Sequence, residues 1–321
     1  MWRDGLAKLG EMDERMQSTR PLISVIIPHL NQPEGLKACL DSLNSQSLER
    51  ARFEVIVVDN GSRTVPEDLV TCHSGTRLLH ESTPGPGPAR NRGIQAASGN
   101  IFAFIDADCR AHPDWLRSAL NVLRSSPERT LLGGDVRIWR DNNNSFTAIE
   151  AYESVFAYRF KRYIERQGFS GTGNLVVRRA DFETIGPFAG IQIAEDIEWG
   201  QRARAVGCTF RYVPEMIVFH PARQSLQELY VKWDRHIQHF LNMAREKPGW
   251  RIRWIARALA VLVSPIVDVA KVFTSDRIQG GSARIKASSV LVAIRTHRTR
   301  KMLSLMRASK GVVWNRDEEH S

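Results

Sequence analysis

Two aspartates, Asp106 and Asp108, directly follow the apolar run Ile101–Ile105, and this arrangement limits the possible folds more than any other feature of the chain. Five consecutive apolar residues predict a strand that is buried on both faces, as in parallel sheets. Ligands of open α/β sheets bind just beyond the carboxyl ends of such strands. Two carboxylates there are unfavourable unless a cation neutralises them, and a divalent cation that also holds phosphate oxygens would do so. The alternative is a solvated aspartate pair in the turn before Pro113.

The segments around this run alternate between strand and helix patterns. Apolar runs predict strands at 22–27, 53–58, 76–80, 101–105 and 131–139, and helical spacing predicts helices at 34–43, 89–97 and 113–123. Pro28 is expected to end the first strand. This order predicts an α/β fold of the Rossmann-like kind, with a mostly parallel sheet flanked by helices and right-handed crossovers.

After residue 139 the sequence patterns predict further helices and strands, followed by an entirely helical C-terminal region. A helix is expected from Ser145 to about Arg166, then a strand entered from the loop Gly171-Thr-Gly-Asn174, and then a helix over Glu195–Ala205. Short strands are expected at 209–213 and 216–219. From Ser225 onward the pattern is helical.

The motifs in their order resemble the family-2 inverting glycosyltransferases of the GT-A fold, over residues 21–222. The resemblance is carried by the strand ending at Pro28, Asp59-Asn-Gly-Ser62, Arg90-Asn-Arg-Gly93, Asp106-Ala-Asp108, Gly171-Thr-Gly-Asn174, Ala194-Glu-Asp-Ile-Glu-Trp199 with Arg202, and Val218-Phe-His-Pro221. It implies a nucleotide-binding half at 21–112 and an acceptor half at 113–222, followed by a basic helical region at 223–321.

The same resemblance implies a binding site for a nucleotide-diphosphate sugar, with a UDP-sugar expected. Pro28 and Asn31 would line the base and ribose pocket, and Asp59 would accept a hydrogen bond from the base. Arg90 would reach the nucleotide or pair with an aspartate of the site. For Asp59 the alternative is an Asx-turn cap, and for Arg90 it is a charge on the helix surface. Relatives often carry an aromatic or hydroxyl residue where this chain has His29 and Leu30.

A divalent metal, Mg²⁺ or Mn²⁺, is also implied. Asp108 would ligate it directly, while Asp106 would face the ribose and a metal-bound water, and His220 resembles the histidine that completes the metal shell in some relatives. Carboxylate and phosphate oxygens suit both ions. A purely structural role for His220 is the alternative.

The family pattern makes Asp196 the general base, because inverting transfer needs one carboxylate to take the proton of the acceptor hydroxyl. Glu195 and Trp199 are the candidate acceptor-binding residues. The two acids could instead complement the helix dipole, and Trp199 could fill the core.

Other functions are compatible with parts of the sequence. An inactive nucleotide-sugar-binding protein would not need Asp106, Asp108 and Asp196 together. A nucleotidyltransferase would carry a glycine-rich signature with Arg and Lys after the first strand, where this chain has Pro28-His-Leu-Asn31. Processive synthesis is disfavoured because Gln201-Arg-Ala-Arg204 is followed by alanine, and nothing marks a nucleophile for a retaining mechanism.

The positive charge is confined to the last third of the chain. Residues 1–222 carry 26 Lys and Arg against 27 Asp and Glu, and residues 223–321 carry 19 against 8, which gives −1 and +11. With Trp250, Trp254 and the apolar stretch 258–267, this predicts a helical region that lies on an anionic membrane surface. A packing subdomain and a spanning hairpin are the alternatives, and no nucleic-acid partner is expected. Four scattered cysteines and no signal-peptide pattern predict a cytoplasmic enzyme, either free or peripheral on the inner membrane face.

Overall fold

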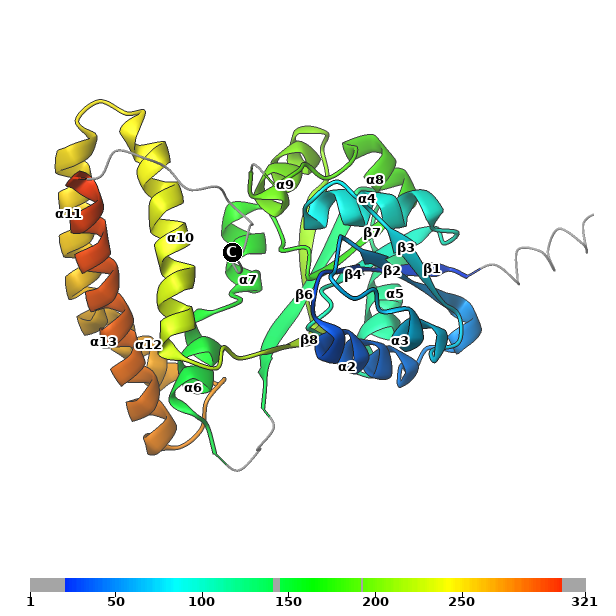
Figure 1. Ribbon diagram of the computed structural model, residues 1–321, viewed down its shortest axis with the longest axis horizontal. Coiled ribbons are helices and arrows are strands. Elements are labelled where there is room, and N and C mark those ends of the chain that lie inside the picture. The colour runs from blue at the N-terminus through cyan, green and yellow to red at the C-terminus, as the bar shows by residue number, and fades with distance from the viewer. Residues whose placement is uncertain (1–20, 141–144, 192, 308–321) are drawn as a thin grey trace, which may run out of the picture. The chain divides into compact units, whose positions relative to one another are not determined.

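The computed structural model of the chain describes residues 21–140, 145–191 and 193–307 (Figure 1). The chain divides into two compact units. The first, which we call the sheet unit, comprises Met1–Val136 and Phe160–His220; the second, the helical unit, comprises Arg137–Arg159 and Pro221–Ser321.

Within the described residues, eight strands form one sheet in the order β3-β2-β1-β4-β7-β6-β8-β5. Their bounds are β1 Ile23–His29, β2 Phe53–Asp59, β3 Thr76–His80, β4 Ile101–Ile105, β5 Arg110–Ala111, β6 Thr130–Trp139, β7 Asn174–Arg178 and β8 Thr209–Pro221. The strands β3, β2, β1 and β4 are parallel, whereas β4 with β7, β7 with β6, and β8 with β5 pair antiparallel. The α/β fold class is confirmed, and the four strands at one side of the sheet, β3, β2, β1 and β4, are parallel to one another.

Strand β1 does not stop at Pro28 as the sequence pattern suggested. It continues to His29, and its register with β2 runs to the pair His29 and Asp59. Its register with β4 ends at Ile26. Pro28 has no N–H to donate, so it is tolerated beyond the end of the β4 ladder, where one side of the strand needs no donor.

Side chains of alternate residues along the central strands build two separate cores. In β4, Ile101, Ala103 and Ile105 pack with α2 (Pro33–Asn44) and α5 (Trp115–Ser125). Phe102 and Phe104 point to the opposite core, which contains residues of α4 (Pro86–Ala96), α8 (Arg179–Ile185) and α9 (Glu195–Ala205). Helices therefore cover both faces (Figure 1), and β4 is fully buried because each of its faces meets a core.

Short helices complete the sheet unit, and two expected elements are different in the structure. The remaining elements are the 3₁₀-helix η1 (Arg50–Arg52), α3 (Glu67–Thr71), α7 (Phe160–Arg162) and the π-helix η2 (Tyr163–Gln167). The single helix expected from Ser145 to Arg166 is broken, because Tyr158 has a positive φ of 43° that helical backbone cannot contain. The two strands expected at 209–213 and 216–219 are one strand, which stays extended through the exposed pair Pro214 and Glu215.

The helical unit confirms the helical character of the C-terminal region. It consists of α6 (Ala148–Phe156), α10 (Leu226–Arg245), α11 (Trp250–Val263), α12 (Pro265–Thr274), α13 (Gly281–Ser304) and the 3₁₀-helix η3 (Leu305–Arg307). Helix α6 starts with a capping box between Thr147 and Glu150. Among the described residues no helix is both long enough and apolar enough to span a membrane.

A buried amide ties the antiparallel side of the sheet together. Asn174, which is 0 % exposed, accepts a hydrogen bond from the indole of Trp115 at 2.8 Å. Its amide nitrogen donates to the carbonyls of Asp135 at 2.9 Å and Met216 at 2.8 Å. A Cβ at Gly134 would lie 2.3 Å from that nitrogen, so glycine is needed at this approach. One side chain thus joins α5, β6, β7 and β8.

Replacing Asn174 with alanine should lower stability by about 2–4 kcal/mol, since three buried polar groups then lose their partner and each costs about 1–3 kcal/mol before relaxation. Urea unfolding followed by fluorescence measures the change. The exposed Asn121→Ala variant in α5 is the matched control and should stay within about 0.5 kcal/mol of the parent. A similar midpoint for Asn174→Ala and the control would show that the amide does not tie the sheet.

Candidate functional site

The candidate active site lies at the carboxyl edge of the sheet unit. Asp106 and Asp108 follow β4, and Arg90 projects from α4. Glu195 and Asp196 open α9, and His220 lies near the end of β8. These residues come from four separate parts of the sequence, and the two aspartates lie just beyond the carboxyl end of a parallel strand, where ligand sites of such sheets form.

Arg90 is the buried centre of one half of the site. Its side chain is 3 % exposed, and its guanidinium donates to Asp106 Oδ1 at 2.7 Å and to Glu195 Oε1 at 3.2 Å. Pairing with an aspartate of the site is one of the two roles expected for Arg90. Because a buried charge must be compensated, this one side chain sets where the acids after β4 and at the start of α9 lie.

Asp196 has a raised pKa. Burial and, to a lesser extent, the neighbouring charge of Glu195 together raise its pKa to about 6. The carboxylate accepts a hydrogen bond from the backbone N–H of Ile197 at 2.8 Å. Glu195 is engaged by Arg90, so of the two acids Asp196 has the properties of a general base that operates near neutral pH.

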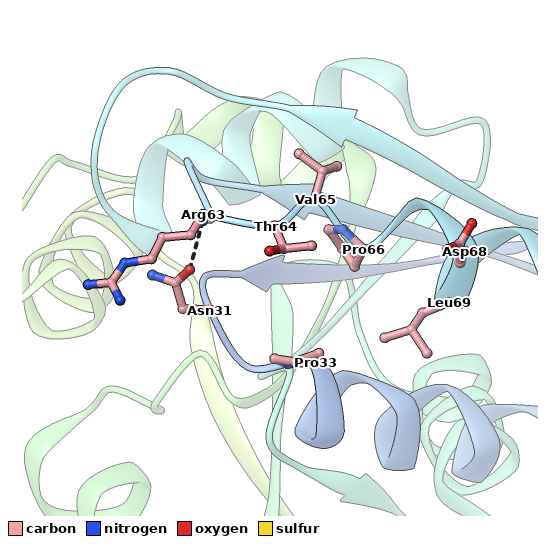
Figure 2. Close-up of a pocket in the computed structure, with 8 residues that line it drawn as sticks. All are labelled: Asn31, Pro33, Arg63, Thr64, Val65, Pro66, Asp68 and Leu69. Atoms are coloured by element: carbon pink, nitrogen blue, oxygen red, sulfur yellow. Dashed lines mark hydrogen bonds between the residues drawn. The ribbon is translucent and has the colours of Figure 1, made fainter.

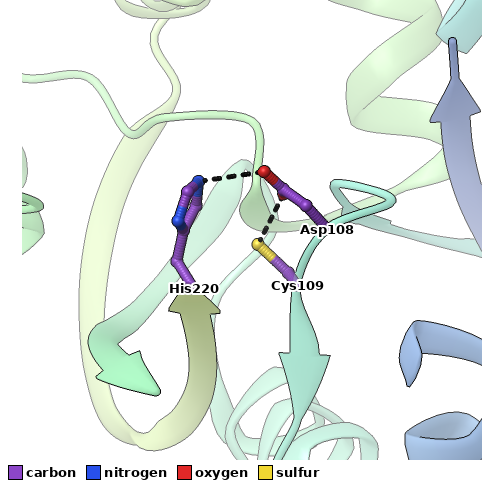
Figure 3. A group of neighbouring side chains, drawn as sticks. All are labelled: Asp108, Cys109 and His220. Atoms are coloured by element: carbon purple, nitrogen blue, oxygen red, sulfur yellow. Dashed lines mark hydrogen bonds and ion pairs between the residues drawn. The ribbon is translucent and has the colours of Figure 1, made fainter. Parts of the chain in front are cut away.

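The other half of the site can hold a metal ion. Asp108 Oδ2 and His220 Nε2 are 3.3 Å apart, and one ligand atom each of Asp108, Cys109 and His220 lie within 4.8 Å of one another (Figure 3). The carboxylate oxygens of Asp108 fit Mn²⁺ or Mg²⁺, whereas an imidazole ligand such as His220 is more usual for a transition metal than for Mg²⁺. Burial, followed by the charges of Asp108 and Asp106, raises the pKa of Cys109 well above its ordinary value, and a thiol is in any case not a usual ligand of Mg²⁺ or Mn²⁺.

Asp106 lies outside that group of ligand atoms and stays with Arg90. The loop before β7 passes very close to it, because a Cβ at Gly173 would lie 2.5 Å from Asp106 Oδ2. Gly173 therefore lets the backbone approach the carboxylate. The direct metal role of Asp106 stays a prediction.

The residues expected to bind the nucleoside surround the ends of β1 and β2. Asp59 is 2 % exposed, with Oδ1 3.0 Å from His29 Nδ1 and Oδ2 accepting from the N–H groups of Gly61 at 3.3 Å and Ser62 at 3.1 Å. Burial tends to raise the pKa of Asp59, but the hydrogen bonds from Ser62 and His29 outweigh it and lower that pKa. This is the geometry of an Asx-turn cap. Contact of Asp59 with a base stays a prediction.

His29 lies in the site although none of the sequence motifs predicted it there. It is 2 % exposed and joins Asp59 to the β1–α2 connection, because the N–H of Gln32 donates to its Nε2 at 3.3 Å. The pairing could have been anticipated from register alone, since both residues end neighbouring parallel strands. For Cys109, beside Asp108, nothing in the sequence indicated a place in the site.

A pocket of about 300 Å³ opens next to this network (Figure 2). Asn31 lines it and has a positive φ of 51°; its Oδ1 accepts from the N–H of Arg63 at 2.9 Å. Figure 2 draws the other lining residues, which are Pro33, Thr64, Val65, Pro66, Asp68 and Leu69. Pro28 is half-buried in β1 and does not line this pocket.

The acceptor-binding role expected for Trp199 is wrong. Its side chain is 1 % exposed, and its ring packs against Phe182 at 5.8 Å and Phe188 at 5.0 Å between centroids. The indole N–H donates to the carbonyl of Gly186 at 2.9 Å. No ring face is left for a sugar, because Phe182 and Phe188 cover the ring of Trp199 and the carbonyl of Gly186 accepts its N–H.

Comparison with known proteins identifies the family of the chain. The family model described as Glycosyl transferase family 2 matches residues 24–186. The chain is 36 % identical to the glycosyltransferase AglE of Haloferax volcanii over 214 residues, which are 65 % of this chain and 69 % of AglE. It is 31 % identical to the amylovoran biosynthesis glycosyltransferase AmsB of Erwinia amylovora over 177 residues, which are 50 % of this chain and 57 % of AmsB.

Solved structures share the fold at low sequence identity. The mannosyltransferase PcManGT from Pyrobaculum calidifontis, in complex with GDP-Man and Mn²⁺, superposes with a TM-score of 0.59 at 17 % identity, covering 91 % of this chain and 88 % of that one. TarS of S. aureus with UDP-GlcNAc gives 0.51 at 17 % identity, covering 85 % and 90 %. The fold is therefore GT-A, and the chain is a glycosyltransferase that belongs to glycosyl transferase family 2.

Proposed function

We propose that the enzyme is a metal-dependent, inverting glycosyltransferase that moves a sugar from a nucleotide-diphosphate donor, a UDP-sugar, to a hydroxyl of a glycan or lipid-linked acceptor. One observation carries the proposal. The paired ligands Asp108 and His220, and the base candidate Asp196, all lie at the carboxyl edge of the sheet unit. An inverting transfer needs a cation for the leaving group and a separate base for the acceptor.

At the donor end, Asp108 and His220 would hold the cation. Bound there, Mg²⁺ or Mn²⁺ supplies charge neutralisation for the departing diphosphate. Asp106 would face the ribose from its position beside Arg90. Arg90 fixes the position of this carboxylate through their ion pair, which is a positioning role and needs no contact between Arg90 and the nucleotide.

At the acceptor end, Asp196 would take the proton as the acceptor oxygen attacks the anomeric carbon from the face opposite the leaving diphosphate. A base with a pKa of about 6 is mostly ionised at neutral pH and still a competent proton acceptor. Glu195, held by Arg90 at 3.2 Å, places its negative charge next to Asp196. That charge is one cause of the raised pKa and so part of the tuning of the base.

The nucleoside would bind near the ends of β1 and β2. The pocket lined by Asn31 and Arg63 supports this, because it lies on the two loops that follow these strands. Asp59 would act through His29 and the turn that it caps. Since PcManGT was solved with GDP-Man and TarS with UDP-GlcNAc, a guanine donor is the competing outcome for a binding panel.

Changing Asp108 to asparagine should weaken Mn²⁺-dependent donor binding by about 100-fold or more, because a neutral amide is a poor ligand for a hard cation and cannot neutralise it. Thermal shift with UDP, UDP-sugars, GDP and GDP-sugars, with and without Mn²⁺, measures binding of each nucleotide through its stabilisation of the fold. Asp276→Asn, at a carboxylate that is 96 % exposed, is the matched control.

Metal-dependent stabilisation of the Asp108→Asn variant equal to that of the parent would contradict the metal assignment. A parent that binds donor with Mn²⁺ but transfers no sugar to any glycan or lipid acceptor, and does not hydrolyse the donor, would favour the alternative of an inactive nucleotide-sugar-binding protein.

Asp196→Asn keeps the shape of the side chain and removes the proton acceptor, so turnover should fall by about 10²–10⁴-fold while donor binding survives. In the parent, kcat/KM should rise about tenfold per pH unit at acidic pH and level off above a pH of about 6, since only the ionised carboxylate can accept the proton. Initial rates against pH test both statements.

Glu195→Gln separates the two acids. Removing its charge takes away one cause of the raised pKa of Asp196, so the acidic limb of the rate profile should move to lower pH while substantial turnover remains. If instead the Glu195→Gln variant is inactive and Asp196→Asn turns over normally, the base is Glu195.

A further inference from the structure

Helices α11 and α12 expose an unusual amount of apolar surface. Eight large apolar side chains on these two helices are at least 40 % exposed, and two of them, Ile266 at 81 % and Ile252 at 77 %, exceed every other large apolar residue described. The eight are Ile252, Ile255, Leu259, Leu262, Val263, Ile266, Val267 and Phe273, and we call them the apolar ridge. Their spacing of three or four residues puts them along one side of the helices.

The opposite side of the same helices is already used for packing. Trp254, Ala258 and Val272 are buried, and the indole of Trp254 donates to the carbonyl of Met302 at 2.8 Å. Asp268 is buried and paired with Arg295 of α13 at 2.8 Å. These helices are therefore held in the helical unit by one face and carry a second apolar face, a pattern expected of a helix with two apolar neighbours.

The outward charges on the two helices themselves are positive. Arg251, Arg253 and Arg257 are exposed on α11. Lys271 of α12 is 51 % exposed and pairs with Asp268. The exposed Asp276 follows α12 and lies outside the two helices. The one acidic residue of the two helices, Asp268, is 7 % exposed and faces inward. The outward surface of 250–274 thus combines large apolar side chains with cations and offers no exposed carboxylate.

We propose that the apolar ridge is a membrane-binding surface, which inserts into the headgroup region of an anionic lipid bilayer with α11 and α12 lying in the membrane plane. Helices of this composition bind at such interfaces by apolar insertion together with attraction between Lys or Arg and anionic lipid. A second copy of the chain is the poorer fit, because a symmetric interface would bring the same arginines together without an exposed carboxylate on these helices to meet them.

The backbone geometry suits this orientation. Helix α11 ends at Val263 and α12 begins at Pro265, and the N–H of Asp268 donates to the carbonyl of Ser264 at 2.8 Å across the junction. Only Ser264 separates the two helices in the sequence. At about 1.5 Å per residue, α11 is roughly 21 Å long and α12 roughly 15 Å, so each offers several turns of apolar contact along a surface.

Co-sedimentation of the full chain with vesicles tests the proposal. The parent should sediment with vesicles of phosphatidylglycerol and phosphatidylethanolamine, bind phosphatidylcholine vesicles much less, and remain partly bound at about 1 M salt, where electrostatic attraction is screened. The triple variant Leu259→Ser, Val263→Ser, Ile266→Ser should lower partitioning by about tenfold or more at both salt concentrations. Arg251→Gln with Arg253→Gln should lower it mainly at low salt.

The matched control is Val231→Ser with Ile285→Ser, at two apolar residues of α10 and α13 that are 48 % and 67 % exposed. It should bind like the parent, and thermal melting checks that all variants are folded. Equal partitioning of the ridge variant and the control would overturn the proposal. So would a parent that stays in solution with anionic vesicles, or one that is a dimer by light scattering and becomes monomeric only in the ridge variant.

Discussion

The charge of Arg90 is the constraint on which the geometry of the active site depends. A guanidinium that is 3 % exposed would be very unfavourable without counter-ions. It obtains one from the turn after β4 and one from the first residue of α9, and its Nε is buried without a partner among the described residues. The strand end and the helix start are thereby fixed relative to each other, although nearly ninety residues separate them in the sequence. The carboxylates at this edge outnumber its cations, which is the electrostatic condition for binding a divalent ion.

Much of this arrangement could be predicted from local sequence. The run Ile101–Ile105 identified β4 because both cores need apolar side chains from the same strand, and the parallel topology then brought the residues after β1, β2 and β4 to one edge. The Asx-turn alternative for Asp59 also came from local chemistry. These features depend on periodicity and turn composition, which a short stretch of sequence contains.

The features that could not be predicted depend on partners distant in the chain. The sequence around Trp199 does not show which face of α9 is buried. Trp199 is buried because Phe182 and Phe188, from an earlier part of the chain, pack against it. The break at Tyr158 needs a positive φ in a residue type that rarely adopts one. Nor does a count of basic residues show which of them are neutralised. In the helical unit, Glu153 pairs with Arg223 and Asp234 with Lys301, so part of the excess charge is balanced internally.

The hydrogen bonds of Asn174 also affect how the site can move. The residue directly follows the loop whose Gly173 lies against Asp106, and its own amide is bonded to three different parts of the sheet unit. Opening of that loop beyond small fluctuations would pull on contacts that belong to the central core. Such regions open at a free energy close to that of global unfolding, in contrast to surface loops. The backbone amides around Gly173 and Asn174 should therefore exchange slowly. Any conformational change during a catalytic cycle is expected in segments farther from β7.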